Sequence, residues 1–265
     1  GREPMKTWGI TDTGLERAEN QDAFATAEIA GFTVAVVCDG MGGERAGREA
    51  SEIAIDEVIE RFSEGYSDDL EDEEIRKLLI SSISAANSVI YTKARFDYKN
   101  FGMGTTCVAA FVNKSSAYIA NVGDSRCYVI TEEGLCQITT DHNVAALLYE
   151  QGKISEDELV NHPQKNMLLR AVGVDKTVQV DTFILDYDDK ISLLLCSDGL
   201  SGYSSNEEIF EIIIDTPFET VANELVKLAY STFVCFCSSS LVTCDNSLFK
   251  LLKSCLKICL EHLVL

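Results

Sequence analysis

Three apolar stretches of this chain end in an aspartate next to a glycine. FTVAVVC leads into Asp39-Gly40, YIANV into Gly123-Asp124 and ISLLLCS into Asp198-Gly199. A carboxylate at the end of a buried strand is held rigidly, and the adjacent glycine lets backbone approach whatever the carboxylate binds. One Asp-Gly after a strand is usually only a turn. Three such pairs on strands of one core predict a shared site. Because crowded carboxylates repel one another, this site needs a hard cation such as Mg²⁺ or Mn²⁺.

A fourth carboxylate and a cationic side chain lie near the N-terminus, in RAENQDAF (17–24). Asp22 can join the cluster, and Arg17 offers planar paired donors that suit a phosphate dianion. Taken by itself, Arg17 would be interpreted as a surface arginine. Beside the carboxylates its paired donors would suit a phosphate group held near bound cations.

The net charge of the chain, −21 over 265 residues, excludes some partners. A field this negative opposes binding to nucleic acid or to an anionic membrane surface, and it attracts cations. The acidic run at 68–74 contributes to it and is interpreted as a solvated loop and first helical turn. No stretch reaches the roughly eighteen apolar residues of a membrane span. We therefore expect neither a nucleic-acid partner nor a transmembrane segment.

The ten cysteines do not predict a disulfide scaffold. The chain is too long for that class of protein and the cysteine spacing is irregular. Four of them sit inside apolar runs, where cysteine serves as a small hydrophobe: Cys38, Cys107, Cys127 and Cys196. The N-terminus has no apolar stretch of the signal-peptide type. The expected location is the reducing cytoplasm.

The elements that must position these residues form a mixed pattern. Hydrophobic periodicity predicts helices at 46–63, 73–97, 143–151, 155–161, 205–214 and 218–229. It predicts strands at 32–37, 105–112, 115–122, 126–131, 178–185 and 191–196. Helices in pairs and strands in clusters favour an α+β fold over βαβ alternation. Because strands such as 191–196 are apolar on both faces, we expect two sheets packed together with helices outside them.

Seven short motifs follow one another in an order that is specific as a set. They are RAENQDAF (17–24), VCDGMGG (37–43), GTT (104–106), NVGDSR (121–126), TTDHN (139–143), HPQKNMLLRAVG (162–173) and CSDGL (196–200). In this order they resemble the type 2C, magnesium/manganese-dependent protein phosphatases, and the bacterial branch most closely. The resemblance spans about residues 8–230, so residues 5–230 are expected to form the catalytic domain.

The resemblance implies a four-layer αββα sandwich, with two antiparallel sheets flanked by helices and a binuclear Mn²⁺ or Mg²⁺ centre at one end. Asp39 would bridge both metals, the Gly40 carbonyl would ligate one of them and Asp198 the other. Asp22 would bind one metal partly through water, and Asp124 would join Asp198 at a third, weaker metal site. Arg17 would hold the substrate phosphate.

The activity implied is removal of phosphate from phosphoserine and phosphothreonine in proteins, opposing a bacterial Ser/Thr kinase. Residues 144–166 match the family's mobile flap beside the active site. Many family members outside the bacterial branch place a histidine, proposed as general acid, directly after the Asp-Gly, where this chain has Met41. Glu44 stands where many bacterial members have a histidine. For His142, packing or flap anchoring is favoured over catalysis, and the general acid is left unassigned.

The pattern breaks after Tyr230. Residues 231–265 are hydrophobic, hold five of the ten cysteines and lack glycine and proline. The family expects a Gly-rich turn here, then Asp-Asn and a final strand whose aspartate ligates a metal with Asp39 and Asp198. Asp245-Asn246 is such a pair, but it arrives late. Asp245 is therefore either a metal ligand or the N-cap of a helix expected from Ser247, and the segment 231–265 replaces or extends the last core strand.

Two alternatives follow from the same residues. The altered tail motivates a pseudophosphatase or regulatory binding module, whereas retention of the four aspartates favours an enzyme. A zinc site at Cys255, Cys259 and His262 lacks a clear fourth ligand. A cysteine-dependent phosphatase is excluded, because six residues separate Cys38 from Arg45 where that mechanism needs five.

Overall fold

The computed structural model describes residues 5–14, 19–187, 191–232 and 239–245. Its strands form two antiparallel sheets. The five-stranded sheet runs in the order β1 (Lys6–Asp12), β11 (Ser239–Asp245), β10 (Ser192–Cys196), β7 (Arg126–Thr131) and β8 (Gly134–Gln137). The other runs in the order β2 (Asp22–Ile29), β3 (Phe32–Met41), β5 (Cys107–Val112), β6 (Ser116–Val122) and β9 (Asp181–Asp186), with β4 (Gly104–Thr105) paired to β3.

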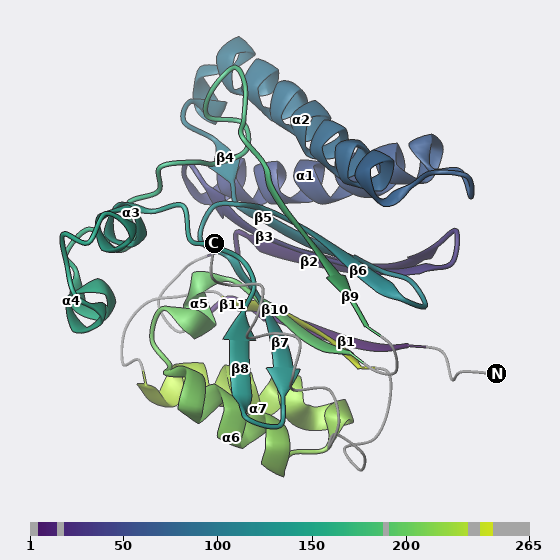
Figure 1. The fold of residues 1–265 in the computed structure, drawn as a ribbon. Coiled ribbons are helices and arrows are strands. Elements are labelled where there is room, and N and C mark those ends of the chain that lie inside the picture. Colours follow the sequence, from purple (N-terminus) through teal and green to yellow (C-terminus); the bar gives the residue numbers. More distant parts are fainter. Residues whose placement is uncertain (1–4, 15–18, 188–190, 233–238, 246–265) are drawn as a thin grey trace.

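The two sheets pack face to face between two layers of helices (Figure 1). α1 (Glu44–Gly65) and α2 (Asp72–Phe96) cover the sheet that contains β3. α6 (Asn206–Asp215) and α7 (Phe218–Thr232) cover the five-stranded sheet, and α5 (Asp198–Ser201) lies at the end of β10. α3 (Val144–Glu150) and α4 (Glu156–Asn161) project to one side (Figure 1). The expected four-layer αββα sandwich is confirmed.

Strand β3 shows why the sequence reads as a continuous apolar run. Val34, Val36 and Cys38 pack into the core beneath α1 and α2. The alternate residues Ala35 and Val37 pack into the core between the two sheets. Because successive side chains of a strand point to opposite faces, a strand covered on both sides must be apolar at every position. All five side chains are fully buried.

Helix α2 begins where the acidic run ends. Glu71 and Glu74 form a capping box at its start: the Glu71 side chain accepts from the Glu74 amide, and the Glu74 side chain accepts from the Glu71 amide. Asp72, Glu73 and Glu74 occupy that turn, where the helix dipole favours negative charge. The interpretation of the run 68–74 as loop and first turn is confirmed. A short 3-10 turn, η1 (Tyr98–Asn100), follows the helix.

The sequence pattern missed four strands, β1, β2, β8 and β11. In β1 and β8 no described side chain is fully buried, so the apolar signal that marks a core strand is absent. The strand expected at 178–185 is β9, which begins later, at Asp181. Among the described residues, no helix has both the length and the hydropathy needed to cross a bilayer.

Candidate active site

The hairpin of β2 and β3 brings the first two aspartates together. Asp22 and Asp39 are direct partners in the antiparallel ladder. Side chains of directly opposed residues lie on the same face of the sheet, about 5 Å apart at Cβ. The resulting pair stands where β3 leaves the core, and Asp22 is almost fully buried.

A hydrogen bond between the sheets adds Asp198 to this pair. The Ser197 hydroxyl, at the end of β10, donates to Asp22 Oδ2 at 2.8 Å. Asp198 follows directly and is the first residue of α5. The serine therefore fixes the distance between the β2–β3 hairpin and the strand that carries Asp198.

The backbone of Asp39 and Gly40 is locked by the Thr105-Thr106 pair. The Asp39 amide donates to Thr106 Oγ1 at 2.9 Å, and the Asp39 carbonyl accepts from the Thr106 amide at 2.9 Å and from Thr105 Oγ1 at 3.0 Å. A Cβ on Gly40 would stand 2.0 Å from the Gly47 carbonyl oxygen at the start of α1. Only glycine fits there, which explains the Asp-Gly pair and the GTT motif in physical terms.

Asp124 is presented by the turn between β6 and β7. Gly123, at φ +107°, donates its amide to His142 Nδ1 at 3.0 Å. Ser125, on the other side, shares a 2.6 Å hydrogen bond with Thr106. The turn is thus held to the same threonine that holds Asp39, and the Asp124 side chain is almost fully buried.

The electrostatics of the cluster favour a bound cation. Burial raises the pKa of Asp39 well above its usual range, and the neighbouring charges of Asp22, Asp198 and Asp124 raise it further. The pKa of Asp124 is raised first by burial and then by Asp198 and Asp141. A divalent cation among these oxygens would reverse the sign of the local field and stabilise the ionised carboxylates.

The donor set therefore fits hard divalent cations, which prefer carboxylate, carbonyl and water oxygens. As they stand, no three of the described His, Cys, Asp and Glu side chains are gathered tightly enough to hold a metal ion by themselves. Because Mg²⁺ and Mn²⁺ sites characteristically include water and backbone carbonyls, aspartates that supply one or two oxygens each remain compatible with such a site.

The carboxylates lie in a cavity of about 970 Å³. Asp39, Asp124 and Asp198 line one side of it. Met41, the segment 168–171 and Val174 line the other. An adjoining cavity of about 520 Å³ shares Asp124 and Asp198 and lies between the flap and α6. The lining of the site thus combines carboxylates with apolar side chains such as Met41 and Val174, and it also includes the charged Arg170 and Asp175.

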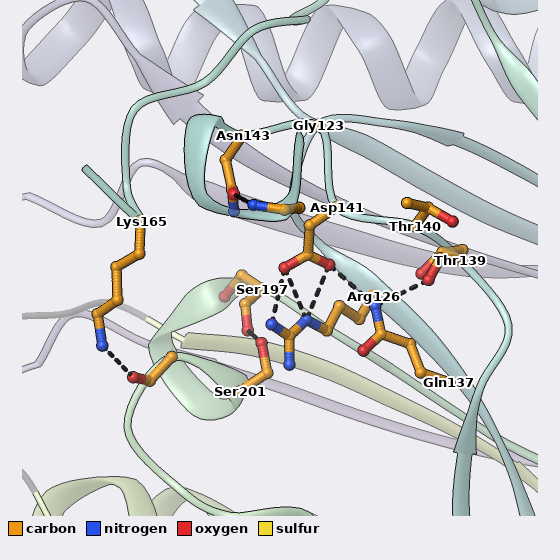
Figure 2. A network of polar contacts seen from close by, with 12 residues as sticks. Gly123, Arg126, Gln137, Thr139, Thr140, Asp141, Asn143, Lys165, Ser197 and Ser201 are labelled. Atoms are coloured by element: carbon orange, nitrogen blue, oxygen red, sulfur yellow. Dashed lines mark hydrogen bonds and ion pairs between the residues drawn. The ribbon is translucent and has the colours of Figure 1, made fainter. Parts of the chain in front are cut away.

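A partly buried ion pair of Arg126 and Asp141 was not anticipated from the sequence (Figure 2). Arg126 Nη2 donates to Asp141 Oδ2 at 2.7 Å, and Arg126 Nε donates to Asp141 Oδ1 at 2.9 Å. Arg126 Nη1 also donates to the Tyr128 hydroxyl at 3.0 Å, and Gln137 Nε2 donates to Asp141. The positive charge of Arg126 lowers the pKa of Asp124, opposing the effect of burial.

His142 is buried and bonded at both ring nitrogens. Nδ1 accepts from Gly123, so Nε2 carries the proton and donates to Asp181 Oδ2 at 2.9 Å. Arg170 Nη1 donates to the other Asp181 oxygen at 2.8 Å. This geometry agrees with the packing or anchoring role expected for His142, because neither nitrogen faces the cavity with a spare hydrogen bond.

The flap expected at 144–166 contains α3 and α4, which are capped by Asn143 and Ser155. The turn after α4 is tied to the rest of the molecule by Lys165, whose Nζ donates to the Gly202 carbonyl at 3.1 Å (Figure 2). The same ammonium lies 5.5 Å from the centre of the Tyr203 ring. The flap is therefore anchored to the loop after α5.

Arg17, the expected phosphate-binding residue, lies outside the described residues. Asp245, an expected metal ligand, is described but does not lie at the cluster. Asp245 is the last residue of β11 and pairs with Ser192 at the beginning of β10. Asp198 follows the opposite end of β10, and at about 3.3 Å per residue the two backbones are more than 15 Å apart. The register is inconsistent with Asp245 as a ligand beside Asp39, and its N-cap alternative involves residues outside those described.

Other expected features of the tail also lie outside the described residues, including the helix from Ser247 and the candidate zinc ligands Cys255, Cys259 and His262. Of the segment 231–265, the structure does describe β11, which lies between β1 and β10. The residues that sequence reasoning missed are Thr106, Ser197 and Arg126, whose partners Asp39, Asp22 and Asp141 lie 67, 175 and 15 positions away in the chain. Only the motifs GTT, CSDGL and NVGDSR, which contain them, gave a signal.

Comparison with known proteins agrees with this geometry. The family model for protein phosphatase 2C matches residues 16–232. The serine/threonine phosphatase stp of Listeria monocytogenes is 41% identical over 206 residues, which cover 77% of this chain and 81% of that protein. The crystal structure of serine/threonine phosphatase Stp1 from Staphylococcus aureus superposes on this chain with a TM-score of 0.84 at 34% sequence identity. The match covers 92% of this chain and 95% of the Stp1 chain.

A further solved structure, the catalytic domain of the serine/threonine protein phosphatase PstP in complex with two manganese ions, has a TM-score of 0.78 at 27% identity. The match covers 91% of this chain and 97% of the PstP chain. Sequence, fold and the gathered carboxylates lead to one conclusion: the chain belongs to the metal-dependent protein phosphatase 2C family of serine/threonine phosphatases.

Proposed function

We propose that this chain hydrolyses phosphoserine and phosphothreonine in proteins with water activated by divalent cations. One observation carries the proposal. Asp39, Asp124 and Asp198, from three separate segments, line one cavity, and burial together with the charges of Asp22, Asp198 and Asp124 raises the pKa of Asp39. A cluster so unfavourable without a cation is costly for a scaffold to keep, whereas a metal-dependent enzyme requires it.

The ligands proposed for two cations, Mn²⁺ or Mg²⁺, are Asp22, Asp39, the Gly40 carbonyl and Asp198. Asp39 would be shared by both, and Asp124 with Asp198 would serve a third, weaker site. The two manganese ions in the PstP structure support this number. When bound, such cations activate water for attack on phosphorus and neutralise charge on the phosphate.

The side chains around the cluster hold the carboxylates in position, and none of them is proposed as a nucleophile. Thr106 and Ser197 hold the carboxylates in place through the hydrogen bonds that they make to Asp39 and Asp22. The nearest cysteine, Cys38, is fully buried and its pKa is raised by that burial, so it stays a thiol and out of reach of a substrate. Arg17 is proposed to bind the phosphate oxygens.

We propose residues 5–230 as the catalytic domain, with residues 231–265 supplying the strand β11 to its core. The physiological substrates would be the phosphoproteins made by a Ser/Thr kinase. The net charge of −21 argues against nucleic acid as a partner.

The test is hydrolysis of p-nitrophenyl phosphate and of a phosphothreonine peptide with Mn²⁺. We expect activity that EDTA abolishes and that Asp39→Asn reduces by several orders of magnitude, with an unchanged far-UV spectrum. Asp186→Asn, on the distant end of β9, is the matched control and should retain activity.

The alternative, a pseudophosphatase motivated by the altered tail, is not favoured by the family match and the phosphatase relatives. Calorimetric titration with Mn²⁺ separates the two. Micromolar binding that Asp39→Asn removes supports the enzyme, whereas folded protein that binds no Mn²⁺ and releases no phosphate supports the pseudophosphatase.

A further inference from the structure

The most exposed large apolar side chains of the described molecule lie in one short segment. Phe96 is 87% exposed, and Tyr98 and Phe101 are each 84% exposed. The next value among large apolar residues is 60%, for Val160 on the flap. We call Phe96, Tyr98 and Phe101 the aromatic rim. Burying three such rings against a partner would remove several hundred Å² of apolar surface from water.

The aromatic rim is presented by an ordered turn. Asp97 caps η1 by accepting from the Lys99 amide at 3.0 Å. The Phe101 amide donates to the Tyr98 carbonyl at 3.3 Å, and the Met103 amide donates to the Asn100 carbonyl at 3.0 Å. Rings held on a fixed backbone lose less conformational entropy on binding than rings on a flexible loop.

This turn continues directly into the wall of the catalytic cavity. Gly102, the residue after Phe101, lines the cavity that contains Asp39. Its carbonyl oxygen lies 2.6 Å from the position where a Cβ on Gly42 would stand, so the turn packs against the loop that follows Asp39. The end of α2 and β4 are seen near each other above the sheets in Figure 1.

A second apolar edge adjoins the same wall. Val174, which lines the cavity and is 46% exposed, lies beside Gly104, three residues beyond Phe101. Asn87 of α2 fixes this edge, because its side chain accepts from the Gly173 amide at 2.7 Å and donates to the Asp175 carbonyl at 3.0 Å. Val174 thus adds an exposed apolar edge to the same cavity that Gly102, the residue after Phe101, also lines.

A protein substrate must cross this mouth. Its phosphorylated side chain has to reach the carboxylates, and its neighbouring residues follow at no more than about 3.6 Å each in an extended chain. Because Phe101 directly precedes Gly102 of the cavity lining, residues a few positions from the phosphoresidue on that side would pass close to the turn that carries the aromatic rim.

We propose that the aromatic rim binds an apolar side chain of the phosphoprotein substrate, two to four residues from the phosphorylated serine or threonine. This inference rests on the proposed function and deepens it, because it assigns a preference for apolar flanking residues to a surface outside the metal cluster. A small substrate such as p-nitrophenyl phosphate does not reach the rim.

The experiment compares two phosphothreonine decapeptides that differ only in the residues two to four positions from the phosphothreonine, leucine in one and serine in the other. Phosphate release with Mn²⁺ gives kcat/KM, and fluorescence anisotropy of labelled peptides gives Kd. We expect the leucine peptide to be preferred by about fivefold or more, since even partial burial of leucine side chains favours association. Tyr98→Ser combined with Phe101→Ser should abolish that preference and leave p-nitrophenyl phosphate turnover unchanged.

The matched control is Ile214→Ser, on α6 at the outer face of the other sheet and 45% exposed, which should keep the preference. Equal kcat/KM and Kd for the two peptides in the parent would overturn the proposal. So would a concentration-dependent dimer that the double variant loses, because the rim would then be covered by a second copy. If p-nitrophenyl phosphate is not hydrolysed, the proposed function fails, and the anisotropy comparison still decides the rim.

Discussion

The ion pair of Arg126 and Asp141 allows a quantitative prediction about stability. The Arg126 and Asp141 side chains are 24% and 9% exposed, and three hydrogen bonds join them. Asp141→Asn keeps the volume but removes the charge, so the guanidinium is left facing an amide. Removing one partner of a buried pair costs roughly 3–5 kcal/mol. Because Arg126 retains some solvent contact, we expect a loss of about 2–3 kcal/mol in the free energy of unfolding.

Equilibrium unfolding in urea, followed by circular dichroism, measures this loss directly. In a domain of this size each kcal/mol lowers Tm by roughly 2–4 °C, so we expect a decrease of about 4–12 °C. The matched control is Glu52→Gln, which breaks the Arg48–Glu52 pair, whose side chains are 58% and 53% exposed. It should change the free energy of unfolding by less than about 0.5 kcal/mol.

A second variant separates the unpaired charge from the lost contact. Arg126→Met combined with Asp141→Leu removes both charges, and replacing a buried pair by apolar residues is often close to neutral. We expect the double variant to be more stable than Asp141→Asn. If Asp141→Asn is as stable as the control, or if the double variant is no better than the single one, the reasoning about the buried pair is refuted.

Three further predictions concern single side chains. Gly40→Ala should abolish phosphate release and lower Tm, because its Cβ would stand 2.0 Å from the Gly47 carbonyl oxygen; wild-type turnover would contradict the assigned close approach. Asn87→Ala, which leaves buried backbone groups without partners, should cost about 2–3 kcal/mol in urea unfolding, whereas a change below 0.5 kcal/mol would show that water replaces the amide. Burial and the Asp72 carboxylate raise the pKa of Tyr118 to about 12. The protonated Tyr118 hydroxyl therefore contributes fully to the free energy of unfolding below about pH 10, and this contribution is lost as the pH rises toward about 12. Tyr118→Phe should flatten the decline of stability over that interval, and an identical pH profile for the two proteins would refute the assignment.

The sequence predicted the layers of the fold because burial on both faces leaves a simple trace. A strand between a helix layer and a second sheet must be apolar at every position, and β3 and β10 show that pattern. Edge strands leave no such trace. The partly exposed β8 and the alternating β1 were missed for that reason, and β2 was missed although it carries Asp22.

The tail shows where a local motif misleads. Asp245-Asn246 has the residue types of a family ligand, and residue types were all that the sequence could offer. The antiparallel register of β11 against β10 places Asp245 at the end of the sheet remote from Asp198. A ligand depends on register, and register is a property of the paired strands.

By itself the sequence determined the fold class and the carboxylates of the site, because apolar runs and the Asp-Gly pairs that end them are local features. Only the tertiary structure decided how the site is held together. The bond from Ser197 to Asp22 joins residues 175 positions apart, and the one from Asp39 to Thr106 spans 67 positions. The Ser197 contact forms only when the two sheets pack face to face, and the Thr106 contact only when β3 pairs with β4 and β5. No pattern within one segment of the chain encodes either of them.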